Sequence, residues 1–423
     1  MPKTTRGVDQ AKRRGIQRGD ASFAASVLGA RGALLSVLVH FFEHGRWGSP
    51  AETAVEGQSL NPEDQLFVLT QAGLYLTATR GLASPEARIC YERAEPLCRS
   101  LNRPLVLLPA LIGQWRYSLH TDTMSAAMQV AERVYSLAQE QNDSAVMIGA
   151  YRVLAVTLYF VGDFESARQY AMRGVQIWRS GGVQSPVEEV MSPVVICLCY
   201  EALSQWHFGE IASSQAALTG GISLAKELND MYALGQALWS TGFLGHFERN
   251  PAEVERVASD LIELSTRQNF GSWLAGAEVL RGWARSASGD TAEGISWIEQ
   301  GIRDFRATGS VLDLPLYLTL KAEALHLADR TSEALEAINE AVAIAERFEH
   351  GYYSAELHRL RGVSLTALGA DETQIDASFC QAIRTAKRQK SVSLEKRAEA
   401  TYAEYRRQKA SASGGRGFRL PLC

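Results

Sequence analysis

The sequence predicts an all-α protein built as a solenoid of stacked helical hairpins with a period of about 40 residues. Three observations predict it: turn residues recur at a regular interval, small side chains keep fixed offsets from those turns, and the composition favours helix interiors. Of the 423 residues, 46% are hydrophobic, 21% are charged and only 12 are Pro, which is typical of a globular helical chain. A chain of this length exceeds one ordinary core and must form several domains or a repeat stack.

The turns are the strongest signal. Their positions differ by 41, 40, 47, 41, 39, 40 and 40 residues, and the one long step contains a loop-like insertion at residues 180–193. Gly, Asn and Asp tolerate the positive φ that commonly ends a helix. The predicted turns lie at Gly81, Asp122, Gly162, Gly209, Asn250, Gly289, Asp329 and Gly369.

Small residues recur in the second helix of each hairpin. Ala167 and Gly174 follow the turn at 162 by the same offsets at which Gly294 and Gly301 follow the turn at 289. Such residues let two helix backbones approach closely. Because one hairpin cannot bury its apolar face alone, it must stack on its neighbours. We therefore expect about eight hairpins over residues 61–408.

These features resemble the tetratricopeptide repeat (TPR): a small residue in the first helix, Gly at the turn, Ala early in the second helix and Ala or Gly late in it. The resemblance implies a right-handed superhelix. That family repeats every 34 residues, whereas this chain repeats near 40. The longer period resembles the sensor regions at the C-terminal end of large bacterial signalling ATPases.

A closer resemblance rests on residues 77–98, 280–284, 301–309 and 355–362. Over residues 60–408 the chain is similar to the C-terminal helical region of bacterial multidomain proteins that join an adenylate or guanylate cyclase to a predicted ATPase. The resemblance implies a regulatory region that controls such a module. No G-x-x-x-x-G-K-[ST] motif occurs in the 423 residues, so we expect no enzyme activity. We also expect a truncated or frame-shifted remnant of a longer protein.

The remaining segments are assigned from composition. Residues 1–30 read as a basic flexible tail, residues 31–60 as irregular capping helices and residues 409–423 as a disordered tail. His40 and His44 belong to an H-x-x-E-H pattern on one helical face, the arrangement of an inverted zinc-protease motif. That motif needs a further carboxylate ligand, which repeat hairpins do not supply. We expect no metal and no cofactor.

Charge and cysteine content narrow the partners and the compartment. The net charge of -4 argues against a nucleic-acid binder, although residues 384–390 are basic. The six Cys form no C-x-x-C pair and are expected to be reduced and buried in a cytoplasmic protein. The apolar stretch at residues 33–42 is too short to cross a membrane, and we expect no other segment to be apolar enough to cross one.

First helices line the concave groove in the resembling family, and positions that flank the small residue are expected to be exposed there. Aromatic and Arg side chains commonly anchor interfaces, although Trp206 and Trp283 could equally pack between repeats. The candidate partner-binding residues are Arg116, Arg152, Tyr159, Trp206, Trp283, His326 and Arg359.

Two functions are consistent with this arrangement. The first is a non-catalytic scaffold that binds a protein or peptide, in an oligomeric state left open. The alternative is the small-molecule sensor region of a large ATP-dependent bacterial transcriptional regulator. An open groove would favour the scaffold, and inner Trp side chains around a closed cavity would favour the sensor.

Overall fold

The computed structural model describes residues 61–181 and 190–411. The chain divides into two units, Met1–Ala72 and Gly73–Cys423. Residues 61–72 are the described part of the first unit, and from residue 62 they belong to a helix that continues into the second unit. The predictions for the N-terminal tail, the capping helices and the pair His40 and His44 lie outside the described residues, as do those for residues 182–189 and 412–423.

The described residues form 17 α-helices and no strand, which confirms the all-helical fold class. In chain order they are α3 (Pro62–Arg80), α4 (Pro85–Ser100), α5 (Pro104–Thr121), α6 (Met124–Gln141), α7 (Ser144–Val161), α8 (Phe164–Gly181), α9 (Pro193–His207), α10 (Ile211–Glu227), α11 (Met231–Phe247), α12 (Pro251–Gln268), α13 (Gly271–Ala287), α14 (Thr291–Ala307), α15 (Leu314–Leu327), α16 (Thr331–Phe348), α17 (Ser354–Ala367), α18 (Glu372–Arg388) and α19 (Val392–Ser411).

Each predicted turn lies between two consecutive helices, and from α5 with α6 to α17 with α18 these two helices pack against each other as a hairpin. Gly162, for example, ends α7 with a φ of 93°. At two turns the backbone differs from the prediction. Asp122 ends α5 in an extended conformation, with a φ of −108°, where a positive φ was expected. Arg249 takes the left-handed conformation with a φ of 56°, and Asn250 instead caps α12 by accepting from the backbone N–H of Glu253. α19 extends to Ser411, three residues into the predicted C-terminal tail.

A second set of turns, between hairpins, escaped the sequence analysis. Here Asn102, Asn142, Asn229 and Asn269 adopt positive φ of 48–58°. Asn is the residue besides Gly that most readily takes this conformation. Asn102 and Asn142 are 40 residues apart, as are Asn229 and Asn269. They precede the hairpins that begin with α5, α7, α11 and α13, whereas Gly309 and Glu349 take this conformation before α15 and α17.

Small residues bring the helices of a hairpin close together, as predicted. A Cβ added to Gly294 would lie 2.4 Å from the carbonyl oxygen of Gly282, and one added to Gly301 would lie 2.6 Å from that of Ala275. No side chain fits at such distances, so α13 and α14 pack backbone against backbone.

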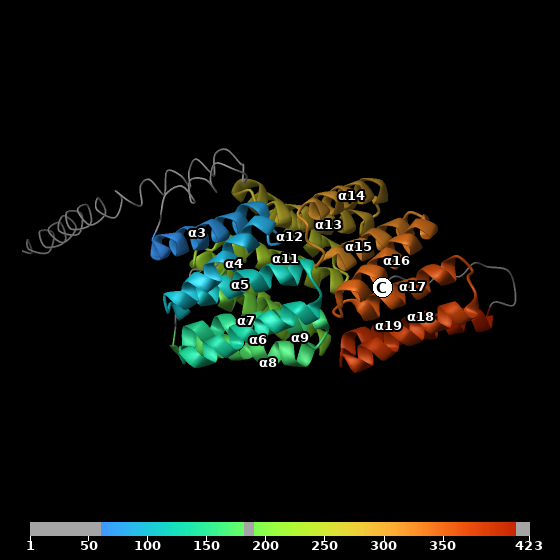
Figure 1. The fold of residues 1–423 in the computed structure, drawn as a ribbon. Helices are drawn as coiled ribbons and strands as arrows, with labels where there is room; N and C mark the ends of the chain where they lie inside the picture. The colour runs from blue at the N-terminus through green and yellow to red at the C-terminus, as the bar shows by residue number, and fades with distance from the viewer. Residues whose placement is uncertain (1–60, 182–189, 412–423) are drawn as a thin grey trace, which may run out of the picture. The chain divides into compact units, whose positions relative to one another are not determined.

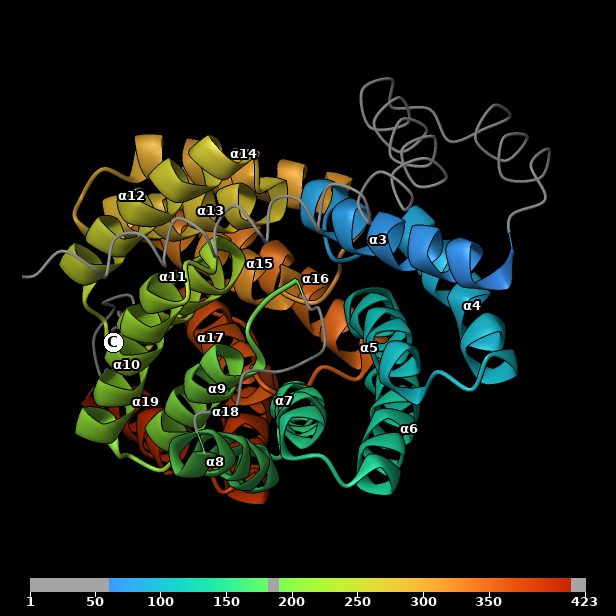
Figure 2. The same ribbon diagram turned by 90° about the vertical axis from the view of Figure 1, so that its left-hand side faces the viewer.

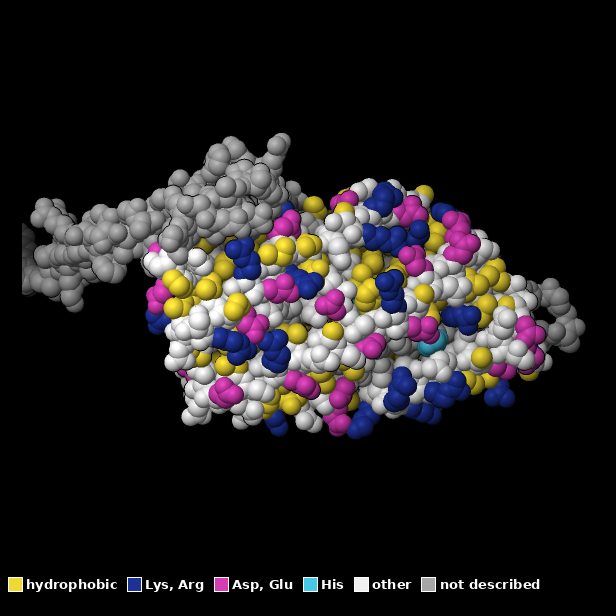
Figure 3. All heavy atoms as spheres, in the orientation of Figure 1, with side chains coloured by type: hydrophobic (Ala, Val, Ile, Leu, Met, Phe, Trp, Pro, Cys, Tyr) yellow, Lys and Arg dark blue, Asp and Glu magenta, His cyan; other side chains and the backbone are white. Residues whose placement is uncertain are grey.

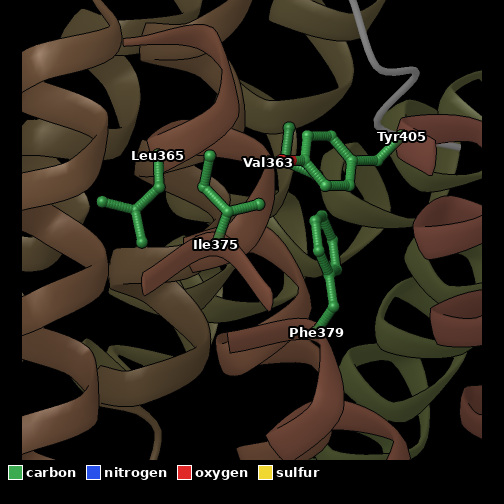
Figure 4. Packing of buried hydrophobic residues seen from close by; sticks show 5 residues of the cluster. All are labelled: Val363, Leu365, Ile375, Phe379 and Tyr405. Carbon is green, nitrogen blue, oxygen red and sulfur yellow. The ribbon is translucent and has the colours of Figure 1, made fainter. Parts of the chain in front are cut away.

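The hairpins form two layers. In Figure 2, α5, α7, α9, α11 and α13 form an inner arc, and α6, α8, α10, α12 and α14 lie outside it. The chain then begins a second superhelical turn, and Figure 1 shows α15–α19 beside α4–α9. The last helices, α17–α19, close the stack with a small core of Val363, Leu365, Ile375, Phe379 and Tyr405 (Figure 4).

The two superhelical turns are joined end to end. At the end of α5, the carbonyl oxygen of His120 accepts from the N–H of Val311, 2.9 Å away, just before α15. At the end of α7, the carbonyl oxygen of Phe160 accepts from the N–H groups of Gly351 and Tyr352, at 2.8 and 3.2 Å, just before α17. Each contact joins a hairpin to the one five hairpins further along the chain.

The same relation holds one hairpin later. The carbonyl oxygen of Trp206 accepts from the Ser393 hydroxyl at 2.6 Å, and Nδ1 of His207 lies 2.7 Å from the Ser391 hydroxyl. We call this set of contacts the seam. It joins the ends of α5, α7 and α9 to the residues at the beginning of α15, α17 and α19. Because the seam satisfies carbonyl groups that α-helices leave unpaired, it turns an open solenoid into a closed one.

A buried ion-pair network reinforces this closure. Arg249, at the end of α11, donates to Glu323 of α15 at 2.6 Å and to Glu356 of α17 at 3.0 Å. Glu356 also pairs with Arg359 at 2.7 Å and with Arg397 of α19 at 3.6 Å. Burial opposes its ionisation, but these guanidinium groups hold the pKa of Glu356 well below its usual range. The network therefore ties three hairpins and the final helix α19 together through charged groups.

One helix corrects the expectation about membrane segments. Within the described residues, α7 is long and apolar enough to cross a membrane by length and composition. Its side chains are mostly buried inside the protein, where it packs against α6, α8 and α9. An inner helix covered by neighbours on several sides needs apolar residues all round, which explains its hydropathy.

Several basic residues near the C-terminal end are paired with acidic ones. Lys387 lies 3.0 Å from Glu399, and Lys390 pairs with Glu165. On the face of the molecule shown in Figure 3, acidic and basic side chains are interspersed. Such a surface offers no long basic stripe on that face.

The seam predicts an unusual sensitivity at Gly351. A Cβ there would lie 1.9 Å from the carbonyl oxygen of Val161, so Gly351→Ala must push the two superhelical turns apart. We expect this variant to lose about 2–3 kcal/mol of unfolding free energy, measured by urea denaturation. Gly220→Ala is the control, because its Cβ meets nothing within 4 Å in α10 and Ala favours a helix. Equal midpoints for the two variants would contradict the seam.

The ion-pair network makes a second prediction. Glu356→Gln removes the carboxylate that three arginines surround in a buried site and should cost about 3 kcal/mol, seen as a lower unfolding midpoint. Glu404→Gln, which breaks the exposed pair of Glu404 with Arg407, should change the midpoint little. A small effect of Glu356→Gln would mean that the network does not hold the hairpins together.

Candidate ligand-binding cavity

The structure buries most of the predicted partner-binding residues. The exposure expected for Arg116, Arg152, Tyr159 and Arg359 is wrong, because the second superhelical turn and neighbouring hairpins cover these positions. Trp206 and Trp283 are also buried, which agrees with the alternative that they pack between repeats. Six of the candidate residues are only 0–4% exposed to solvent: Arg116, Arg152, Tyr159, Trp206, Trp283 and Arg359. His326, near the end of α15, is half-buried.

These residues fall into three places. Trp283, Arg359 and Trp206 lie at the ion-pair network. The Trp283 indole donates to Glu323 at 2.8 Å. Arg397 of the network lies over the Trp206 ring. Tyr159 packs among aromatic rings, 5.3 Å from Tyr200. Their role in binding a partner stays a prediction. Arg116 and Arg152 meet in one internal cavity.

The cavity lies inside the inner arc. Its walls come from α5, α7, α9, α11 and α13, together with the residues that begin α15. The centre of a water molecule can occupy a volume of about 50 Å³ inside it. The empty space measures about 700 Å³ when the part open to solvent is included. All of the lining residues are buried except Leu82 and Ser272, which are half-buried. These two residues therefore mark its mouth.

Three tryptophans from different helices form the apolar wall. The Trp115 indole donates to the Thr157 hydroxyl at 2.8 Å, and the Trp239 indole donates to the Tyr317 hydroxyl at 3.0 Å. Both rings are thereby fixed. The indole N–H of Trp273, in contrast, has no acceptor among the described residues, although its ring lines the cavity.

Two guanidinium groups supply positive charge. Arg152 of α7 lies over the Trp115 ring, 5.1 Å from its centre, which stabilises the cation in a buried position. Arg116 of α5 is 4% exposed, and its Nε–H has no acceptor among the described residues.

Asp313 faces the cavity from the start of α15. It occupies the N-cap position but makes no capping bond with its side chain, and its Oδ1 has no donor among the described residues. Burial raises the pKa of Asp313 to about 7. A carboxyl group that is half-protonated near neutral pH can both accept and donate a hydrogen bond, which suits ligand recognition.

His120 adds no charge to the cavity. Burial, and secondarily Arg116, lowers its pKa to about 3, so the ring is neutral at physiological pH. Its Nδ1 lies 2.8 Å from the Ser310 hydroxyl, within the seam. The cavity and the seam are thus built from the same segments, at the end of α5 and the beginning of α15.

Only part of this site is visible in the sequence. The repeat pattern indicates Arg116 and Arg152 as interface residues, and it places Trp239 and Trp273 on helices at packing positions. Asp313 escapes notice, because an Asp before Leu-Pro at a helix start reads as an ordinary N-cap. The missing capping bond is visible only in the structure.

A second hollow lies between α8, α9 and α10 and measures about 380 Å³. Small residues of α10, among them Ala217 and Gly220, line one side of it. Glu201 and Gln205 of α9 line the other, and each has a side-chain oxygen without a donor in the described part of the chain. Trp178 is the one Trp among its lining residues, and its charged lining residues are Arg179 and Glu201.

Comparisons with known proteins agree with the helical repeat. The family model of anaphase-promoting complex subunit 5 matches residues 194–247 and 316–350, well under half of the chain. An uncharacterized protein of Rhizobium meliloti (strain 1021) is 25% identical over 346 residues, which are 80% of this chain and 33% of that protein. The chain thus spans about a third of the length of the curated relative it matches.

Among solved structures, a Rap protein complexed with competence and sporulation factor has 11% identity and a TM-score of 0.49, with 83% of this chain and 99% of that chain covered. PlcR of Bacillus thuringiensis, in complex with the peptide PapR7 and DNA, has 16% identity, coverages of 58% and 85% and a TM-score of 0.41. Human IFIT1 with PPP-AAAA has 12% identity, with 85% of this chain and 80% of that chain covered and a TM-score of 0.47. None of these likenesses bears on function. The chain is an all-helical solenoid of TPR-like hairpins.

Proposed function

We propose that this solenoid is a ligand-sensing module that binds a small molecule in its interior cavity. The observation that carries the proposal is the cavity itself: three tryptophans from different hairpins surround it, and Arg116, Trp273 and Asp313 line it with polar atoms that have no partner among the described residues. Buried polar atoms are normally paired. A cluster of unpaired ones around a cavity is therefore best explained by a polar ligand.

The position of the cavity gives the ligand a way to act on the whole solenoid. Its walls combine the first superhelical turn, through α5–α13, with the beginning of the second, through Asp313 and Tyr317. A ligand that contacts both would stabilise the closed superhelix over an open one, by about 2.7 kcal/mol at a hundredfold excess over its Kd. Ligand binding would thus be read out as closure of the seam.

In a longer protein, this closure would control an attached domain. The curated relative is about three times as long as the matched part of this chain, which gives such an arrangement a precedent in size. A nucleotide cyclase or ATPase as the attached module follows from the sequence resemblance alone. We propose a cytoplasmic module without enzyme activity of its own.

A second candidate function is the binding of a protein or peptide partner on the outer surface. The hollow between α8, α9 and α10 favours it, because it is wider than the interior cavity and offers the unpaired oxygens of Glu201 and Gln205 to a donor. The two functions are compatible, since one uses the inside of the superhelix and the other its outside.

Blocking the mouth of the cavity tests the leading proposal. Ser272 is half-buried at the mouth and lies close to the Gly81 turn, so Ser272→Trp should obstruct the entrance. Ser288→Trp, at the exposed other end of α13, is the matched control. In a screen of small polar metabolites by thermal shift and tryptophan fluorescence, we expect at least one compound to stabilise the wild type and the control variant.

The Ser272→Trp variant should lose this stabilisation while keeping its own melting temperature. Trp115, Trp239 and Trp273 lie in the cavity wall, so binding should also change the intrinsic fluorescence. The proposal is contradicted if no compound binds, or if every compound that binds stabilises Ser272→Trp as well as it stabilises the control.

A further inference from the structure

We propose that mild acid separates the last three helices, α17–α19, from the first superhelical turn, and that three buried histidines between them take up the protons. These are His207 at the end of α9, His246 near the end of α11 and His350 just before α17. None of the three belongs to the cavity wall. The inference therefore goes beyond the proposed function and does not depend on a ligand.

Helices α17–α19 form a body that can move as one. They share a core of their own, which includes Val363 of α17, Phe379 of α18 and Tyr405 of α19. The hydrogen bonds that join this body to the first superhelical turn lie at the seam, where α17 meets the end of α7 and α19 meets the end of α9. A separation would break these contacts and leave the junction of α5 with α15 in place.

His207 is fully buried where α19 meets α9. It is 0% exposed, and its ring stacks on Phe164 of α8 with the ring centres 3.5 Å apart. Nδ1 pairs with the Ser391 hydroxyl, whereas Nε2 has no partner among the described residues. The charged group that faces the ring is Arg397 of α19, and burial together with this cation keeps the pKa of His207 well below its usual range. A protonated ring would bury a cationic N–H without an acceptor.

His246 is fully buried where α11 meets α17. Nε2 lies 2.8 Å from the Tyr353 hydroxyl, and Nδ1 has no partner in the described part of the chain. Two carboxylates and two guanidinium groups face the ring, and these belong to Glu323, Glu356, Arg249 and Arg397. Burial outweighs the attraction of the carboxylates and lowers the pKa of His246 to about 3.

His350 lies at the junction of α7 with α17. It is 2% exposed, and neither of its ring nitrogens has a partner among the described residues. The ring lies beside that of Phe348, and the titratable group that it faces is the neutral ring of His120. Burial lowers the pKa of His350 to about 4.

The three rings therefore stay neutral while the superhelix is closed. Once α17–α19 separate, water reaches the rings, which then regain the pKa near 6.5 of an exposed His. The separated form binds protons that the closed form cannot bind. Closure is thus fully stable above this pH and is lost progressively below it.

The other ionisable groups nearby do not cancel this effect. The pKa values of Glu323 and Glu356 are lowered, so both carboxyls are already ionised at neutral pH and stay ionised in mild acid. Asp313, whose pKa is about 7, and His120 line the cavity at the junction of α5 with α15, which remains joined.

Amide hydrogen exchange of the full chain over a range of pH tests this inference. The N–H groups of Gly351 and Tyr352 report the separation, because they donate to the Phe160 carbonyl across the seam. Each ring that regains its ordinary pKa favours the separated form about tenfold between about pH 7.5 and 5.5. After correction for the intrinsic pH dependence of exchange, we expect the protection of these two amides to fall about a thousandfold. The amides of α13, in the first superhelical turn, should keep theirs.

Two substitutions assign the protons. His207→Asn keeps a hydrogen-bonding group near the position of Nδ1, and His246→Gln keeps one near that of Nε2, but neither new side chain titrates. The double variant should lose protection only about tenfold over the same range, because His350 alone remains. His326→Asn is the control, since His326 is half-buried at the end of α15 and lies outside the seam. It should behave like the wild type.

The wild type alone also decides the question if the double variant does not fold. The slope of the logarithm of protection against pH gives the number of protons taken up on separation, and we expect about three below pH 6.5. A slope near zero at Gly351 and Tyr352 would overturn the inference. An equal loss of protection in α13 would overturn it as well, because that result means general unfolding in acid. Equal losses in the wild type and the double variant would exclude His207 and His246 as the groups that bind the protons.

Discussion

The fold depends on how the two superhelical turns meet. Helix ends leave carbonyl groups without intrahelical partners, and in a solenoid these usually face solvent. Here the carbonyls of His120 and Phe160 are instead paired with backbone N–H groups of Val311 and Gly351, about 190 residues later in the chain. Only Gly fits at position 351, because of the nearby Val161 carbonyl. The seam, more than any single hairpin, sets the form of the second unit.

Closure has a consequence for the polar residues of the inner helices. In an open groove, arginines and tryptophans would meet water or a partner, whereas here they are enclosed. In the ion-pair network, the positive charges have acidic partners within the protein. Glu323 and Glu356 balance most of the charge of Arg249, Arg359 and Arg397. The other group surrounds the cavity, where atoms of Arg116 and Asp313 have no partner among the described residues. This difference separates a group that holds the superhelix together from a candidate binding site.

The repeat could be predicted from the sequence and the closure could not. Turn residues such as Gly162, and small residues such as Gly294 and Gly301, are local signals with a fixed spacing, and each had its expected effect. The number of hairpins per superhelical turn depends on small rotations between neighbours, which accumulate over the stack and leave no single-residue mark. For this reason the sequence places Arg116, Arg152 and Arg359 on the correct helices but with the wrong exposure. Asp313 escapes prediction because its special feature is an absent capping bond.

Amide hydrogen exchange at the seam tests the central claim most directly. Gly351 and Tyr352 lie between hairpins, and their N–H groups donate to the Phe160 carbonyl across the seam. The equivalent residues at an earlier junction between hairpins, Gly271 and Ser272, begin α13 and are exposed and half-buried, respectively. A closed superhelix predicts that the amides of Gly351 and Tyr352 exchange as slowly as those of the inner helix α7, with Gly271 and Ser272 exchanging fast. Exchange at Gly351 and Tyr352 as fast as at Gly271 and Ser272 would contradict closure.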